Sequence, residues 1–252
     1  MADGTTLTWY GHSCLELRTG GGVVVLIDPW FGNPTSPRAA SDVTECDLML
    51  VSHGHFDHLG SGPRSVRDAD SLSIARRTSA TWVAVHELSL WLETELEGSE
   101  VEIIGMNKGG TVSARGLSVT MVRADHSAGD WSDAGEGPLY LGEPVGFVIG
   151  LEDGTRVVYT GDTDVMGDMD LVRQLHKPDV AIMPIGGHYT IGPVGAARAA
   201  KMLGVRAVIP VHYGTFPILA GTPDELRSEL GRIGAGNIKV VAPDRGVATP
   251  LP

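Results

Sequence analysis

Residues 53–58 read His53-Gly54-His55-Phe56-Asp57-His58, so four side chains that can bind a metal ion lie within one short stretch. The preceding residues 47–52, Asp-Leu-Met-Leu-Val-Ser, form an apolar run that predicts a buried strand. In an extended stretch the His53 and His55 imidazoles point the same way; Asp57 keeps that parity and His58 faces elsewhere. One tetrahedral zinc does not easily take four ligands from one tight turn, so the spacing favours two metals. A polar surface turn is the alternative, but a turn rarely contains three histidines.

Three further candidate ligands follow predicted strands later in the chain. His126 comes after the strand pattern at 117–123, Asp162 after the one at 155–160, and His212 after the one at 206–211. Each is ordinary by itself, but neighbouring strand ends meet at one rim of a sheet. We therefore predict a binuclear site with the following ligands: His53, His55 and His126 on metal 1, Asp57, His58 and His212 on metal 2, and Asp162 between them.

Such a centre suits hydrolysis. Two divalent metals ~3.5–4 Å apart share a hydroxide, lower its pKa and polarise the bond under attack. Imidazole and carboxylate ligands accept zinc, manganese, nickel or iron, so we expect two divalent ions, with zinc as the first candidate. Asp57 is also a predicted catalytic residue, since a carboxylate beside the nucleophile can orient it or move its proton.

Three other residues are candidates for the site. His188 lies in Gly186-Gly187-His188, where glycines allow close backbone approach, and we predict that it is catalytic and contacts substrate or an oxyanion. A loop histidine held by backbone hydrogen bonds is the alternative. Asp28 ends an apolar strand and is predicted to orient a ligand histidine, although a simple Asp-Pro turn also fits. His12, between two short strands, is predicted to support the ligands indirectly.

The chain reads as a single domain, 1–252, with two β-rich, pseudo-symmetric halves that meet near residue 125. Helical patterns are predicted at 87–97, 168–176, 193–203 and 223–233, among the many short strand patterns. This order favours an α/β (α+β) fold of the αββα four-layer sandwich type over a doubly wound parallel sheet. Residues 127–144 are rich in Gly, Asp and Glu, and a long loop of this kind is typical of a functional lid.

Composition narrows the class of protein. The 252 residues are 42% hydrophobic, but no apolar run approaches the length of a membrane span, and the N-terminus does not resemble a signal peptide. Two cysteines are too few for a disulfide framework, so a cytoplasmic location is expected. The net charge of −12, with Lys and Arg scattered, disfavours a nucleic-acid partner. We expect a small-molecule substrate and neither nucleic acid nor membrane as a partner.

The motif set resembles the metallo-β-lactamase superfamily, whose signature is HxHxDH followed by spaced His, Asp and His. Within it, the chain is similar to the UlaG-like metal-dependent hydrolases. The matching stretches are TWYGHSCLEL (8–17), LIDPW (26–30), VSHGHFDHLG (51–60), GMNKGG (105–110), YTGDTDVMGDM (159–169), MPIGGHYTIGP (183–193) and VIPVHYGTFP (208–217). The resemblance implies an αββα fold, a usually binuclear hydrolytic site and a homo-oligomer, and it leaves the substrate open.

The leading hypothesis is a binuclear hydrolase of a small or medium ester, lactone or phosphodiester. A nuclease or RNA-processing enzyme of the same fold is the first alternative, and the acidic balance argues against it. A non-catalytic metal-binding regulator is the second. Degenerate members of catalytic families normally lose ligands, and none of the seven predicted ligands is missing here.

Overall fold

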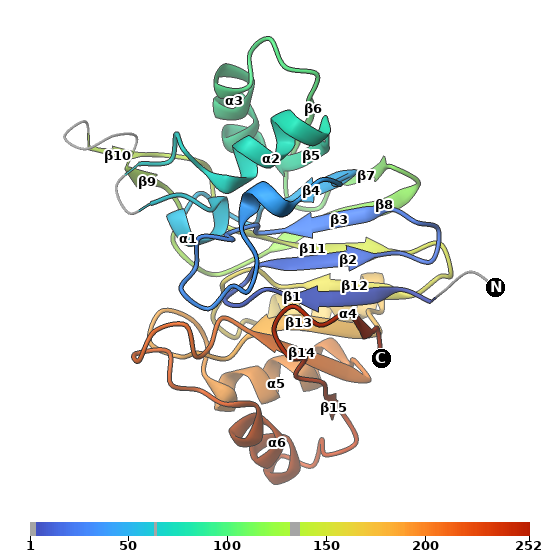
Figure 1. The fold of residues 1–252 in the computed structure, drawn as a ribbon. Helices are drawn as coiled ribbons and strands as arrows, with labels where there is room; N and C mark the ends of the chain where they lie inside the picture. Colours follow the sequence, from blue (N-terminus) through green and yellow to red (C-terminus); the bar gives the residue numbers. More distant parts are fainter. Residues whose placement is uncertain (1–3, 63–64, 132–136) are drawn as a thin grey trace.

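Two mixed β-sheets form the centre of the protein in the computed structural model, which describes residues 4–62, 65–131 and 137–252 (Figure 1). The first sheet has the order β16 (Thr249–Pro250), β1 (Thr6–Trp9), β2 (Leu15–Arg18), β3 (Val24–Ile27), β4 (Leu48–Leu50), β5 (Thr81–Val85) and β6 (Glu102–Met106). The second has the order β15 (Lys239–Val240), β14 (Ala207–Val211), β13 (Val180–Pro184), β12 (Arg156–Tyr159), β11 (Val145–Gly150), β8 (Leu117–Arg123) and β7 (Thr111–Ala114).

The two sheets have the same pattern of strand pairing. In the first, three antiparallel pairings run from β16 to β3, and three parallel pairings follow from β3 to β6. In the second, three antiparallel pairings run from β7 to β12, and three parallel pairings follow from β12 to β15. Each strand therefore has a counterpart: β1 matches β8, β3 matches β12, β4 matches β13, and β5 matches β14.

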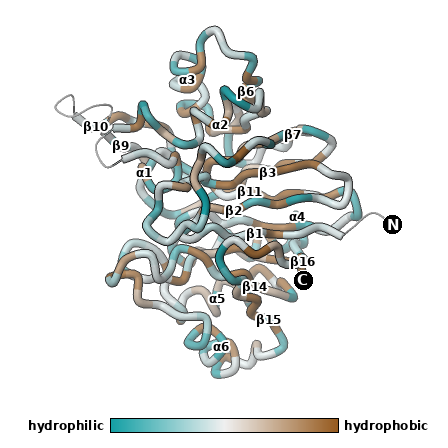
Figure 2. Tube along the Cα trace, viewed as in Figure 1, coloured by the Kyte–Doolittle hydropathy of each residue, from teal (hydrophilic) through white to brown (hydrophobic). Residues whose placement is uncertain are grey.

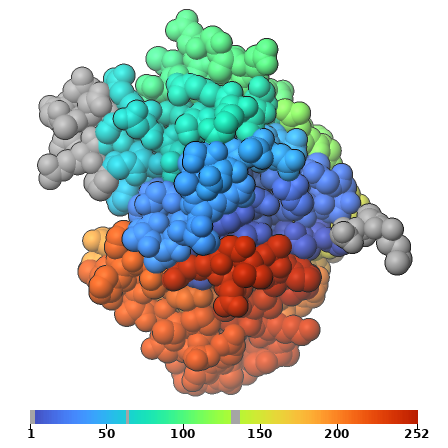
Figure 3. Space-filling model, viewed as in Figure 1, coloured from blue at the N-terminus to red at the C-terminus, as the bar shows by residue number. Residues whose placement is uncertain are grey.

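The chain passes between the sheets at a different place from the one expected. It leaves the first sheet after β6 and enters the second at β7, earlier than the predicted junction near residue 125. The β7–β8 hairpin pairs with β11 and so belongs to the second half. The C-terminal strand β16 then returns to pair with β1, and Figure 3 shows this red segment between the blue and orange parts of the molecule.

Helices form the outer layers. They are α2 (Asp70–Thr78) and α3 (His86–Glu95) beside the first sheet, and α4 (Asp168–His176), α5 (Pro193–Leu203) and α6 (Pro223–Arg232) beside the second. Alternate residues of a strand pack on opposite faces of its sheet. In β13, Val180 and Ile182 join the core shared by the two sheets, while Ala181 and Met183 pack in the core with α4, α5 and α6. The hydrophobic colour in Figure 2 accordingly follows the strands. The predicted αββα sandwich is confirmed.

Some local structure departs from the expectations. Helix α2 is not evident in the sequence, because Leu72, Ile74 and Ala75 are few apolar residues for a clear helical period, and packing on the first-sheet core stabilises it. Part of the expected loop at 127–144 forms an antiparallel hairpin of β9 (Asp130–Trp131) and β10 (Pro138–Leu139). Residues 132–136 of that segment lie outside the described ones. No helix in the described part of the chain combines the length and apolar character needed to cross a membrane.

Candidate metal centre

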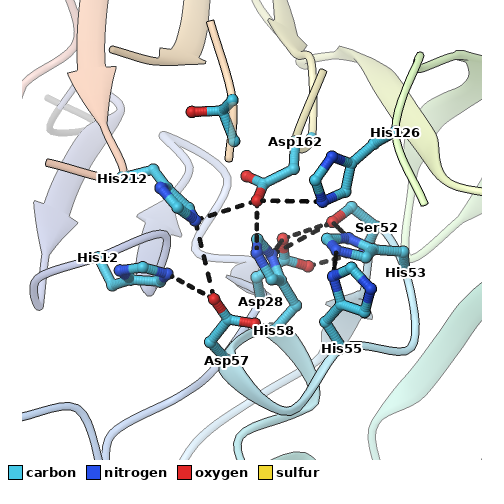
Figure 4. Close-up of polar contacts among 12 residues, drawn as sticks. His12, Asp28, Ser52, His53, His55, Asp57, His58, His126, Asp162 and His212 are labelled. Atoms are coloured by element: carbon cyan, nitrogen blue, oxygen red, sulfur yellow. Dashed lines mark hydrogen bonds and ion pairs between the residues drawn. The ribbon is translucent and has the colours of Figure 1, made fainter. Parts of the chain in front are cut away.

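The predicted ligands meet at one edge of the sandwich. They follow the carboxyl ends of β4, β8, β12 and β14, which all open at the same rim because these strands share one direction within their sheets. Figure 4 shows His53, His55 and His126 on one side of the cluster, His12 and His212 on the other, and Asp162 between them. The structure therefore brings together all seven side chains predicted as ligands.

The first group comprises His53, His55 and His126, with one donor atom from each within 4.8 Å of the others. His53 Nε2 lies 2.8 Å from His55 Nδ1, so the two imidazoles do converge as the alternation predicts. Burial, helped by the neighbouring imidazole of His58, lowers the pKa of His53 well below its usual value and also lowers the pKa of His55. Burial also lowers the pKa of His126. The neutral imidazole, which is the form that binds a metal, is thus favoured at all three.

The second group comprises His12, Asp57, His58 and His212, again within 4.8 Å. It contains the three ligands predicted for metal 2 and adds His12. The expectation that Asp57 continues the extended parity of His53 and His55 is wrong. The backbone turns into the short helix α1 (Phe56–Leu59) after His55, so one helical turn directs Asp57 and His58 inward.

Asp162 lies between the two groups. Its Oδ2 is 3.2 Å from His58 Nε2, 3.0 Å from His212 Nε2 and 3.8 Å from His126 Nε2. Burial opposes the charged form, but the imidazoles of His212 and His58 outweigh it and hold the pKa of Asp162 well below its usual value. Burial likewise opposes charge on His212, yet the Asp162 carboxylate raises its pKa to about 9.

Several buried polar atoms of this cluster lack a hydrogen-bond partner and are suited to binding a cation. His58 Nε2, both ring nitrogens of His212 and Asp162 Oδ1 are buried and make no hydrogen bond among the described residues, although the nitrogens approach the carboxylate. Burying such atoms without a partner is costly. Lone pairs that converge from imidazole and carboxylate are a donor set that divalent transition metals accept.

Asp28 lies behind this cluster and contacts one of the predicted ligand histidines, while its orienting role stays a prediction. Its buried carboxylate accepts hydrogen bonds from Ser52 N at 2.7 Å, Ser52 Oγ at 2.6 Å, His58 Nδ1 at 2.6 Å and the Tyr159 hydroxyl. A hydrogen bond on Nδ1 turns Nε2 of His58 toward the cluster. Ser52 and Tyr159 were not predicted; the available signal was that Tyr159 ends β12 before Asp162 and that Ser52 directly precedes His53.

The backbone around the cluster is locally strained. His12, Asp28 and His212 have φ values of 51°, 44° and 55°, in the left-handed region that non-glycine residues rarely adopt. Such residues persist when surrounding contacts hold them, and they are frequent at functional sites. The backbone of Gly186 packs directly against the backbone of His212. Only glycine fits there, because a Cβ atom would lie 2.1 Å from the carbonyl oxygen of His212.

His188 is not brought into the cluster. Its side chain is exposed, and its ring packs edge-to-face against Tyr189 with the ring centroids 4.4 Å apart. Its neighbour Tyr189, which was not a predicted site residue, lines the cavity above the cluster. The catalytic role of His188 stays a prediction, and its exposed position does not favour it.

A cavity of about 570 Å³ opens over the cluster. Its walls combine the site residues with five apolar or aromatic side chains: Phe56, Tyr189, Phe216, Ile218 and Leu219. Ser127, Gly129 and Asp130 complete the lining, and the Asp130 carboxylate accepts a hydrogen bond of 2.7 Å from Phe56 N in the ligand loop. The segment predicted as a lid therefore contacts the site, while its movement stays a prediction.

A family profile described as "Beta-lactamase superfamily domain" matches residues 6–212. The chain belongs to this superfamily. It is 39% identical over 247 residues to a UPF0173 metal-dependent hydrolase of Myxococcus xanthus strain DK1622, covering 98% of this chain and 84% of that one. It is 42% identical over 236 residues to the UPF0173 hydrolase of Rubrobacter xylanophilus, covering 93% and 92%.

A solved structure agrees with these relatives. The metallo hydrolase Igni18 of Ignicoccus hospitalis matches with a TM-score of 0.80 and 32% identity over 97% of each chain. The protein is therefore a metal-dependent hydrolase of the metallo-β-lactamase superfamily, as the sequence predicts. Its place among the UlaG-like members, its oligomeric state and its cytoplasmic location stay predictions.

Proposed function

We propose that this hydrolase binds two divalent ions and cleaves an uncharged carboxylic ester or lactone of small or medium size. The observation that carries the proposal is the pair of ligand groups, joined by Asp162, at the floor of a largely apolar cavity. When bound, such a metal pair supplies a hydroxide nucleophile near neutral pH and polarises the carbonyl under attack.

Each ligand has a place in this scheme. His53, His55 and His126 would hold one ion, Asp57, His58 and His212 would hold the other, and Asp162 would be available to both. This division is supported by the two groups of converging donor atoms described above and by the position of Asp162 Oδ2 near His58, His126 and His212. A third group, His53, His58 and Asp162, lies where the two meet. Zinc is the first candidate, and manganese, nickel and iron suit the same donors.

Asp57 is the residue proposed to move a proton. Asp57 and Asp162 both line the cavity, but the Asp57 side chain is 16% exposed and the Asp162 side chain is 3% exposed. The more exposed carboxylate is the better placed to take a proton from the attacking water and deliver it to the oxygen of the leaving alcohol.

The cavity wall favours a neutral substrate. Among the residues that the structure describes, its lining includes no lysine or arginine, the side chains that usually hold a phosphate. Phe56, Phe216 and Ile218 instead offer apolar surface to an acyl or alkyl group. The same lining and the net charge of −12 argue against the phosphodiesterase and nuclease alternatives.

The test combines metal analysis with a substrate panel. Protein stripped with a chelator is reloaded with zinc, manganese, nickel or iron and assayed on p-nitrophenyl esters, γ- and δ-lactones and bis(p-nitrophenyl) phosphate. We expect two ions per chain, loss of activity on stripping, and faster turnover of esters or lactones than of the phosphodiester. Preferred turnover of the phosphodiester would overturn the substrate class. Two bound ions with no hydrolysis of any substrate would favour the regulator alternative.

A further inference from the structure

We propose that His12 is a positioning residue: Thr215 holds it, and it holds the Asp57 carboxylate in the orientation that the second metal position requires. The inference rests on the proposed binuclear function. It assigns to His12 and Thr215 a role that the ligand motif does not contain.

Both ring nitrogens of His12 already have partners. Nε2 lies 2.9 Å from Asp57 Oδ2, and Nδ1 lies 3.0 Å from Thr215 Oγ1. His12 is 1% exposed, so water does not compete for either contact. An ionised Asp57 accepts only, so Nε2 carries the hydrogen and Nδ1 accepts from the Thr215 hydroxyl. The Asp57 carboxylate thereby fixes the tautomer, and the Thr215 hydroxyl donates to the remaining nitrogen and holds the ring in place.

The backbone of His12 connects it to a second ligand. Its carbonyl oxygen accepts hydrogen bonds from His212 N at 2.9 Å and from Trp9 Nε1 at 2.8 Å. The rings of His12 and His212 lie with their centroids 3.9 Å apart. One buried residue with a left-handed backbone thus contacts two of the three predicted ligands of metal 2, and Figure 4 shows it on their outer side.

The internal symmetry of the fold sharpens this assignment. His12 follows β1 and His126 follows its counterpart β8, each three positions after the last strand residue. His126 belongs to the first ligand group, and its Nε2 stays 3.8 Å from Asp162 Oδ2 with the side chain 13% exposed. His12 instead uses Nε2 on Asp57 at hydrogen-bond distance. The same place in the two halves therefore serves as a ligand in one and as a support for a ligand in the other.

Four variants and one control test the proposal. His12→Gln keeps a donor near the position of Nε2, whereas His12→Asn is too short to reach Asp57 and tolerates the left-handed backbone. Thr215→Val removes only the hydroxyl, and Thr215→Ser retains it. His86→Asn, at an exposed histidine outside the cluster, is the matched control. Each protein is titrated with Co²⁺ and with Zn²⁺, and the stoichiometry, both affinities and the Co²⁺ absorption spectrum are recorded.

We expect His12→Asn and Thr215→Val to weaken binding of the second ion by about 10–100-fold, the usual effect of removing a partner of a ligand. Binding of the first ion stays unchanged, and His12→Gln and Thr215→Ser recover most of the loss. The proposal is overturned if His12→Asn or Thr215→Val binds both ions like wild type. It is also overturned if His12→Gln is as weak as His12→Asn with a changed Co²⁺ spectrum, since His12 would then be a ligand itself. If His12→Asn does not fold, the Thr215 pair decides. A wild-type chain that binds fewer than two ions would contradict the proposed function instead.

Discussion

The two halves of the molecule share one pattern of strand pairing but contribute to the site in different ways. In the first half, a single loop after β4 carries His53, His55, Asp57 and His58. In the second half, the predicted ligands come singly, after three strand ends: His126, Asp162 and His212. The loop after β13, the counterpart of β4, places Gly186 against the backbone of His212 and leaves His188 exposed.

Residues at equivalent positions in the two sheets have different surroundings and different roles. His86 and His212 each directly follow counterpart strands, β5 and β14, yet His86 is exposed and His212 is buried in the cluster. Asp28 and Asp162 follow β3 and β12. Asp28 bonds to His58 from behind, while Asp162 lies between the two ligand groups. A repeated scaffold therefore aligns strand ends at one rim, while the direction and neighbours of each side chain determine whether it enters the cluster.

The largest expected effect comes from the His212 and His86 pair. His212→Asn removes a donor of the second ion, so we expect hydrolysis to fall by roughly a thousandfold, equivalent to several kcal/mol of lost transition-state stabilisation. His86→Asn should keep wild-type turnover. Steady-state kinetics with ion content by mass spectrometry check both variants. Equal losses in the two variants would show that the counterpart positions do not differ in function.

Gly186→Ala should destabilise the fold. Its Cβ would lie 2.1 Å from a backbone oxygen, and backbone cannot rotate away, so we expect the free energy of unfolding to fall by about 3 kcal/mol. Gly231→Ala, in α6 with open space around its Cβ, should instead stabilise slightly, because alanine favours helix. Urea unfolding of both metal-free variants measures the difference, and a Gly186→Ala protein as stable as wild type would refute the close-packing role of this loop.

Asp28→Asn should weaken metal binding without removing a ligand. The amide cannot accept all the hydrogen bonds that Ser52, His58 and Tyr159 donate to the carboxylate, so we expect an affinity loss of about 10–100-fold. Competition titration against a chromogenic chelator measures it. Asp153→Asn, at an exposed carboxylate in the turn between β11 and β12, at the opposite end of β12 from Asp162, is the control. An unchanged affinity for both ions in Asp28→Asn would contradict its orienting role.

The smallest effect is expected at the cavity wall. Phe216→Ala removes apolar surface, so kcat/KM for a long-chain p-nitrophenyl ester should fall by roughly tenfold, while that for the acetate ester changes little. Leu175→Ala, on an exposed residue outside the cavity, should change neither. A uniform loss for both esters in Phe216→Ala would mean that the wall supports the centre and does not select the substrate.

Local pattern was enough for part of this protein. The run from His53 to His58 predicts a metal site because the ligand types and their spacing all occur within one stretch of chain. His126, Asp162 and His212 each follow an apolar strand pattern. They are predicted as the other ligands, since parallel strand ends meet at one rim. The αββα class follows from the same alternation of elements, and the structure confirms it.

Tertiary structure decided the rest, because the relevant contacts join residues that are distant in sequence. Thr215 lies 203 positions from His12, and their hydrogen bond exists only because the two sheets meet at this rim. The turn of α1 redirects Asp57, and burial separates His212 from His86 and excludes His188. Residue type and spacing therefore determined which groups can bind metal, whereas packing decided which of them converge, which support them and what surface faces the substrate.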